Sequence, residues 1–93
     1  MTPDITPERI AGMRSTVLRL LDGRSAEATI CPSEVARAVA GPAGVYPNDQ
    51  SWRAVMPIVH AAVDQMLDDE LVALSWKGKV MASRNGPYRI RRA

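Results

Sequence analysis

The sequence has very few of the side chains that form covalent crosslinks or bind structural metals. With one cysteine, Cys31, an internal disulfide is excluded. Together with the single histidine, His60, this cysteine supplies too few ligands for a zinc site built from cysteine and histidine. We therefore expect a fold that forms without a disulfide, a metal or a cofactor.

Phenylalanine is absent, and aromatic residues make up only 4% of the chain. Core volume must come from leucine, isoleucine, valine and methionine, helped by two tryptophans and two tyrosines. Hydrophobic residues still reach 46%, above the level of disordered chains, and 93 residues are enough for one small core. The sequence predicts a single folded domain over residues 1–93.

The sequence also lacks a long apolar run. No stretch approaches the roughly 18 apolar residues that a membrane-spanning helix needs. The opening MTPDITPERI has neither the basic nor the apolar region of a secretory signal. We expect a cytoplasmic protein with no membrane partner.

Acidic residues are missing from the last fifth of the chain. Residues 75–93 contain six basic residues and no acid, whereas residues 1–74 hold the other six bases and all ten acids. This asymmetry is compatible with nucleic-acid contact, although a solvated edge strand also carries cations for solubility.

Helix signals occur in three places. Thr6 and Pro7 are typical of a helix start, and Gly23 of its end, which predicts a first helix with one apolar face. A second, shorter helix is expected to begin after Cys31. A third should begin near Ser51, after a loop over 41–50. Pro57 should make 51–56 a separate turn or a kink, because proline lacks an amide donor and clashes with the preceding turn.

Cys31 lies at the start of the second helix in the block CPSEVAR. With Glu34 three residues later, it occupies the position of serine or threonine in a capping box. A thiol is a poor acceptor, so we expect a weak cap and a half-buried side chain. Exposure of the sulfur would instead favour a reactive thiol, because a helix N-terminus can activate it.

Alternation with a period of two predicts strands. Val72, Leu74 and Trp76 should face inward in one strand, and Tyr88 and Ile90 in another, paired as an antiparallel hairpin. A short extended segment is expected at 27–30, a turn at 77–79 and an irregular segment at 80–87. The order α-β-α-α-β-β, with three helices and a small antiparallel sheet, predicts an α+β fold of the winged-helix type.

Four blocks carry a family resemblance: TICPSEVARAV, WRAVMPIVHAAVDQML, LVALSWKGKV and GPYRIRR. In this order they resemble a family of small bacterial proteins catalogued as a domain of unknown function, over about residues 13–92. The resemblance implies a winged-helix-like fold and brings no catalytic mechanism.

The expected function is modest or non-specific binding of double-stranded DNA through a basic wing. Lysine and arginine side chains would contact phosphates, whereas the acidic C-terminal half of the third helix leaves few groups to read base edges. The candidate contact residues are Arg37, Ser51, Arg53, His60, Lys77, Lys79, Arg84, Arg89 and Arg91.

A second hypothesis is a protein-interaction or dimerisation module that does not bind DNA, with self or another protein as partner. Its candidate residues are Val45, Tyr46, Trp52 and Met56, unless Trp52 simply folds against the domain. An enzyme is not expected. Cys31 and His60 would be the nucleophile and base, but His60 is predicted to be exposed, opposite the apolar stripe of its helix.

Overall fold

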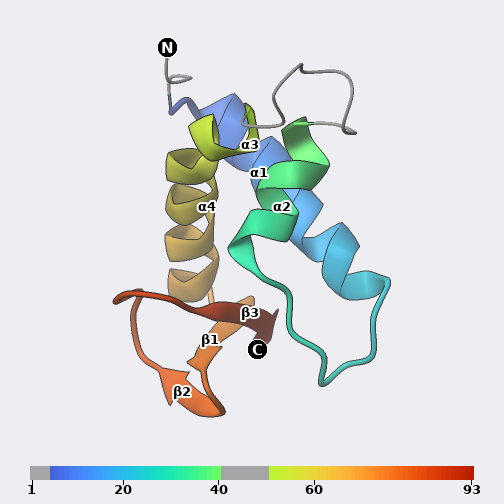
Figure 1. Cartoon of the computed structure of the whole chain (residues 1–93), viewed down its shortest axis with the longest axis vertical. Coiled ribbons are helices and arrows are strands. Elements are labelled where there is room, and N and C mark those ends of the chain that lie inside the picture. Colours follow the sequence, from blue (N-terminus) through green and yellow to red (C-terminus); the bar gives the residue numbers. More distant parts are fainter. Residues whose placement is uncertain (1–4, 41–50) are drawn as a thin grey trace.

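The computed structural model describes residues 5–40 and 51–93 (Figure 1). The expected loop at 41–50 lies outside these residues. The described part is an α+β fold, as the sequence predicts. Its elements are α1 (Pro7–Asp22), α2 (Pro32–Ala40), α3 (Ser51–Ala54), α4 (Met56–Asp68), β1 (Val72–Trp76), β2 (Lys79–Met81) and β3 (Arg89–Arg92).

Local signals determine the first helix. The Thr6 side chain accepts a hydrogen bond from the Arg9 amide at 3.2 Å, and Pro7 occupies the first helical position. Gly23 follows the last turn and donates its amide to the Arg19 carbonyl. Both predicted ends of α1 are confirmed.

Pro57 separates α3 from α4. It lies in the first turn of α4, where its missing amide would have no partner within the helix. The expected separate turn is therefore a short helix of its own, Ser51–Ala54. The described residues thus form four helices rather than the three that the sequence indicated.

The sheet has the strand order β2-β1-β3, with β1 antiparallel to both neighbours. The predicted antiparallel pairing of β1 with β3 is confirmed, but the two strands do not form a hairpin, because β2 lies between them in sequence and forms the hairpin with β1. The prediction of an irregular segment at 80–87 is wrong at its start, because Val80 and Met81 belong to β2. Lys77 and Gly78 have φ values of 52° and 82°, and a two-residue turn of this kind returns the chain directly onto its partner strand.

The expected strand at 27–30 is reduced to one bridged residue. Ile30 exchanges two backbone hydrogen bonds of 2.8 Å with Ile90. Before it, the Ala28 amide bonds to the Ser25 carbonyl in a turn, which prevents a longer ladder. The named elements therefore follow the order α-α-α-α-β-β-β rather than α-β-α-α-β-β.

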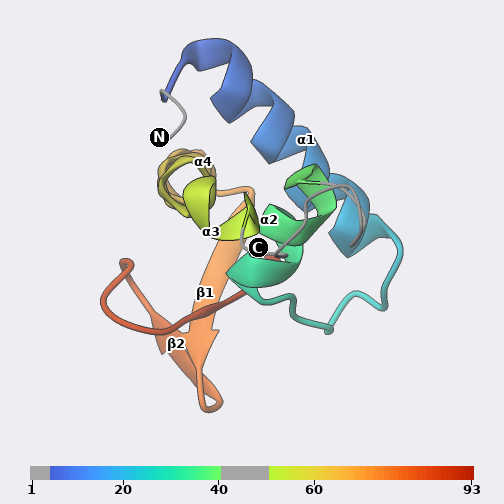
Figure 2. The ribbon, with the colours of Figure 1, turned by 45° about the horizontal axis from the view of Figure 1, so that its top comes forward.

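The core lies between α1, α2, α4 and the inner face of the sheet. Figures 1 and 2 show these helices packed together above the sheet, with the β1–β2 hairpin projecting at the lower end. The buried residues are Met13, Val17, Leu21, Ile30, Val35, Ala36, Ile58, Val59, Ala62, Val63, Met66, Val72, Leu74, Tyr88 and Ile90.

Trp76 departs from the predicted inward pattern of β1. Val72 and Leu74 are buried, but 40% of Trp76 is exposed. Its position opposite Lys79 places it on the projecting hairpin, beyond the part of the sheet that the helices cover. The alternation of apolar residues therefore predicts which face of the strand a side chain lies on, but it does not predict at which residue the buried core ends.

Candidate functional site

Lys77 and Lys79 lie at the projecting end of the β1–β2 hairpin. Lys77 is in the tight turn, Lys79 begins β2, and both side chains are exposed. Neither lysine forms an ion pair with any residue in 5–40 or 51–93. Their charges therefore remain available to an external anion.

Arg91 adds a third exposed cation on β3. It pairs with Ala73, one position from the buried pair of Leu74 and Ile90, so it faces the outer side of the sheet. Lys79 pairs with Trp76, which lies on the same face as Leu74, so Lys79 and Arg91 project from opposite faces of the sheet. Arg91 also has no ion-pair partner in the described part of the chain. We call Lys77, Lys79 and Arg91 the sheet cations.

Arg84 differs from these cations because it is bound to helix α4. Its Nε and Nη2 atoms donate to the two carboxylate oxygens of Asp64, each at 3.2 Å. This hydrogen-bonded pair raises the pKa of Arg84. The sequence offered Arg84 as a phosphate contact, but its donors are directed at Asp64.

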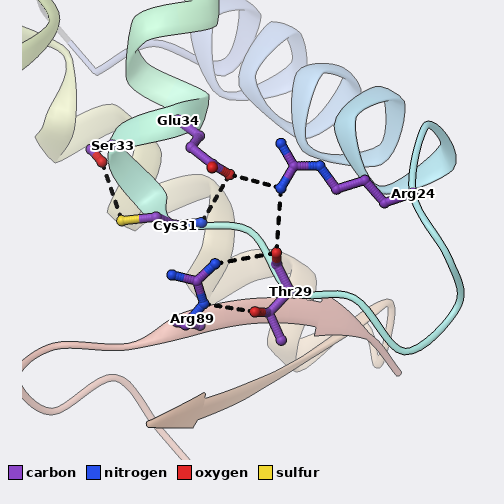
Figure 3. Close-up of polar contacts among 6 residues, drawn as sticks. All are labelled: Arg24, Thr29, Cys31, Ser33, Glu34 and Arg89. Carbon is purple, nitrogen blue, oxygen red and sulfur yellow. Dashed lines mark hydrogen bonds and ion pairs between the residues drawn. The ribbon is translucent and has the colours of Figure 1, made fainter. Parts of the chain in front are cut away.

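Arg89 is held inside the fold. Its Nε donates to Thr29 Oγ1 at 2.6 Å and its Nη2 to the Thr29 carbonyl at 3.3 Å, which fixes the segment before α2 against β3 (Figure 3). The side chain is half-buried rather than free on the outer face. This candidate contact therefore has a structural role.

The same segment contains Cys31. Glu34 Oε2 accepts the Cys31 amide at 3.2 Å, as a capping box requires, and also contacts Arg24 Nη1 at 3.3 Å (Figure 3). The sulfur is 3.1 Å from Ser33 Oγ, and the side chain is half-buried as predicted. Cys31 thus lies directly before α2, in the position of its N-cap.

His60 is also bound within the fold, and its predicted exposure is wrong. Its Nδ1 lies 2.7 Å from the Tyr88 hydroxyl, and only 4% of Tyr88 is exposed. Burial, followed by the nearby Arg84 charge, lowers the pKa of His60, while Asp64 opposes this shift. Burial likewise raises the pKa of Tyr88. A half-buried histidine whose ring nitrogen contacts Tyr88 is poorly suited to contacting DNA.

Arg37 and Arg53 meet at the opposite end of the molecule from the hairpin. Arg37 comes from α2 and Arg53 from α3, and each guanidinium carbon lies 4.7 Å from a ring centroid of Trp52. Both side chains are exposed. The ninth DNA candidate, Ser51, is the first residue of α3, and its side chain lies outside the described residues.

The four sequence blocks that suggested a family all occur within this arrangement. A family model, described as "Protein of unknown function (DUF3253)", matches residues 11–93. The chain belongs to the DUF3253 family. No curated protein matches the sequence.

Two of the four candidate residues of the protein-interaction hypothesis lie in the described part of this DUF3253 protein, and two do not. Trp52 and Met56 are half-buried and pack against the core, whereas Val45 and Tyr46 lie outside the described residues. The more exposed apolar side chains include Trp76 at 40% and Val80 at 75%, both on the β1–β2 hairpin. Sequence reasoning missed Val80 because it assigned this residue to an irregular segment.

Cys31 and His60, the candidate nucleophile and base, have different partners in the described residues. His60 Nδ1 is engaged by Tyr88, and the contacts of the Cys31 sulfur in the described residues include Ser33 but not His60.

A groove of about 490 Å³, which the sequence did not predict, is lined by Arg9, Gly12, Met13, Thr16, Val39, Val55 and Ile58. Over residues 5–40 and 51–93, no cluster of three or more metal-binding side chains occurs. No helix in the same ranges is long and apolar enough to cross a bilayer.

Proposed function

We propose that this protein is a winged-helix module that binds double-stranded nucleic acid through its phosphates, with little sequence preference. The observation that carries the proposal is the set of sheet cations. Lys77, Lys79 and Arg91 come from an acid-free C-terminal segment and have no ion-pair partner in the described chain. Such cations contribute affinity by displacing the counterions of the nucleic acid.

The topology supports the winged-helix part of the proposal. Three longer helices precede a hairpin, and β3 lies between β1 and the bridged residue Ile30. This places a small antiparallel sheet beside α1, α2 and α4, with a projecting hairpin in the position of a wing. Because fold alone does not determine function, the binding hypothesis depends on the cations.

The surface of α4 explains the weak sequence preference. A recognition helix reads bases through side chains that reach the major groove. Here His60 is engaged by Tyr88, and Asp68 is exposed at the C-terminal end of the helix, where it would repel phosphates. Affinity should therefore come from the sheet cations, independently of base sequence.

Fluorescence anisotropy with a random-sequence duplex, measured over a salt series, tests the proposal. The expected result is salt-sensitive binding that weakens about 40-fold between 50 and 200 mM salt if three phosphates are contacted. Each of Lys77→Ala, Lys79→Ala and Arg91→Ala should lower the slope of log affinity against log salt by about 0.9. Arg19→Ala on α1 is the matched control, because it removes an exposed arginine elsewhere.

Two results would contradict the proposal. One is the absence of duplex binding by the folded wild-type protein at low salt. The other is an equal loss of affinity in Arg19→Ala and in the three sheet-cation variants, because this would show a general charge effect instead of a site. Circular dichroism of each variant confirms that it is folded.

A second candidate function is self-association through the free edge of β2. This strand is at the edge of the sheet, and Val80, with 75% of its surface exposed, faces solvent there. Unpaired edge strands are templates for further pairing. Sedimentation at several concentrations tests this function: wild type should form dimers that Val80→Lys abolishes, and a monomer at all concentrations would rule it out.

A further inference from the structure

Trp52 brings two arginines from different helices onto one indole. Arg37 is on α2 and Arg53 on α3, and both guanidinium carbons are 4.7 Å from a Trp52 ring centroid. Trp52 is itself half-buried against the core, so the platform is attached to the body of the domain. The two cations are therefore held in position before any ligand arrives.

A cation–π contact does not supply hydrogen-bond acceptors to a guanidinium. The attraction is between the positive charge and the ring, so the N–H donors of the group still need oxygen partners. Neither Arg37 nor Arg53 has a hydrogen-bond or ion-pair partner in the described residues. Both arginines thus keep their donors available for an anion.

Two positive charges on one indole repel each other, and a bound anion would relieve this repulsion. The paired oxygens of a phosphate suit these donors, because guanidinium groups bind phosphate, as they bind carboxylate, through pairs of parallel hydrogen bonds. No acidic residue of the described chain forms an ion pair with Arg37 or Arg53. The N–H donors of Arg37 and Arg53 and the repulsion between their positive charges therefore both favour an anionic ligand.

We infer that Arg37 and Arg53 form a second phosphate-binding site beside Trp52, which holds a backbone phosphate of the bound nucleic acid. The inference rests on the proposed function for the source of the phosphate. The site is at the α3 end of the molecule, and the hairpin lysines are at the other end of a long axis of 36 Å (Figure 1). One turn of B-DNA is about 34 Å long, so one duplex can reach both ends.

The test compares duplex binding of wild type with that of the double variant Arg37→Lys and Arg53→Lys. This variant keeps the net charge but removes the planar donors, so its affinity should fall at least about fivefold at low salt. Arg19→Lys, the matched control, should stay within about twofold of wild type. In parallel, NMR follows the Nε–Hε signals of Arg37 and Arg53 during titrations with duplex, with inorganic phosphate and with polyglutamate.

Each outcome decides between the hypotheses. Shifts of both arginine signals with duplex, together with the loss of affinity in the double variant, support the site. Normal duplex binding by the double variant overturns the site and leaves the proposed function intact. If wild type binds no duplex, the proposed function fails. Shifts with inorganic phosphate would then still support a phosphate site, whereas shifts with polyglutamate alone would overturn it in favour of an acidic peptide.

Discussion

At the scale of single residues, Glu34 links the start of α2 to Arg24, which lies ten residues before Glu34 in the sequence. Its Oε2 accepts the amide of Cys31 and contacts Arg24 after α1. The ion pair with Arg24 is exposed and contributes little by itself. The bond to the Cys31 amide has more effect, because it satisfies a donor at the start of α2.

Glu34→Ala should therefore lower the free energy of unfolding by about 1 kcal/mol, the usual cost of a lost cap. Cys31→Ser should leave it unchanged or raise it slightly, because a hydroxyl accepts hydrogen bonds better than a thiol. Urea denaturation measures both. Glu27→Ala, which removes an exposed glutamate outside the helices, is the control. A large loss in Cys31→Ser would show that the sulfur fills an apolar space.

His60 gives the protein a pH dependence with a defined sign. Because burial and Arg84 lower its pKa in the fold, the unfolded chain takes up a proton more readily than the folded one. The stabilisation is complete above the unfolded pKa of about 6.5 and is lost as pH falls below it. Stability should therefore decrease as the solution becomes more acidic.

The measurement is urea unfolding at pH 7.5 and at pH 5.5, for wild type and for His60→Asn. Asparagine keeps a hydrogen-bonding group near the Tyr88 hydroxyl but does not titrate. The advantage of wild type over His60→Asn should shrink at the lower pH. Equal differences at the two pH values would refute the assignment.

At the scale of elements, the β1–β2 turn combines a backbone requirement with the phosphate contact proposed for Lys77. Lys77 has a φ of 52°, a left-handed conformation that asparagine adopts more easily than lysine. Gly78, at a φ of 82°, completes a turn for which Asn-Gly is a preferred sequence. Lysine at this position is therefore a poor choice for stability and is consistent with a role in binding.

Lys77→Asn should raise the free energy of unfolding by about 0.5 kcal/mol while weakening duplex binding. Lys79→Asn is the matched control, because it removes the same charge from the neighbouring strand and gains nothing in the turn. Thermal denaturation and anisotropy give the two readouts. Equal stability of the two variants would contradict the backbone argument.

The elements were predictable where their signals are local. Thr6, Pro7 and Gly23 define α1 within their own neighbourhood, and Pro57 alone predicts the break before α4. Strand β2 was missed because three residues are too short for alternation to show.

The candidate site was predicted less well than the helices and strands. The partners that remove Arg84 and Arg89 from it, Asp64 and Thr29, are 20 and 60 residues away in sequence and leave no local signal.

At the scale of the whole molecule, the sheet cations and the Arg37–Arg53 pair should act as two separate contacts on one duplex. The long axis of 36 Å corresponds to about ten base pairs of B-DNA. A duplex much shorter than this can engage only one end. Affinity should therefore rise steeply as the duplex grows from about 6 to about 14 base pairs, and then level off.

Anisotropy with a series of duplex lengths checks this expectation. The double variant Arg37→Lys and Arg53→Lys should lose the steep increase, whereas Arg19→Lys should keep it. A smooth increase that is the same in all three proteins would indicate one contact region only.

The bridge between Ile30 and Ile90 also bears on the order in which the fold forms. β3 joins β1 to the segment before α2, so Ile90 meets a residue that lies 60 positions earlier in the chain. The helices depend on local contacts and can form early, whereas the β3 edge of β1 stays unpaired until this long loop closes. We therefore expect the pairing of β3 to be the slow step of folding.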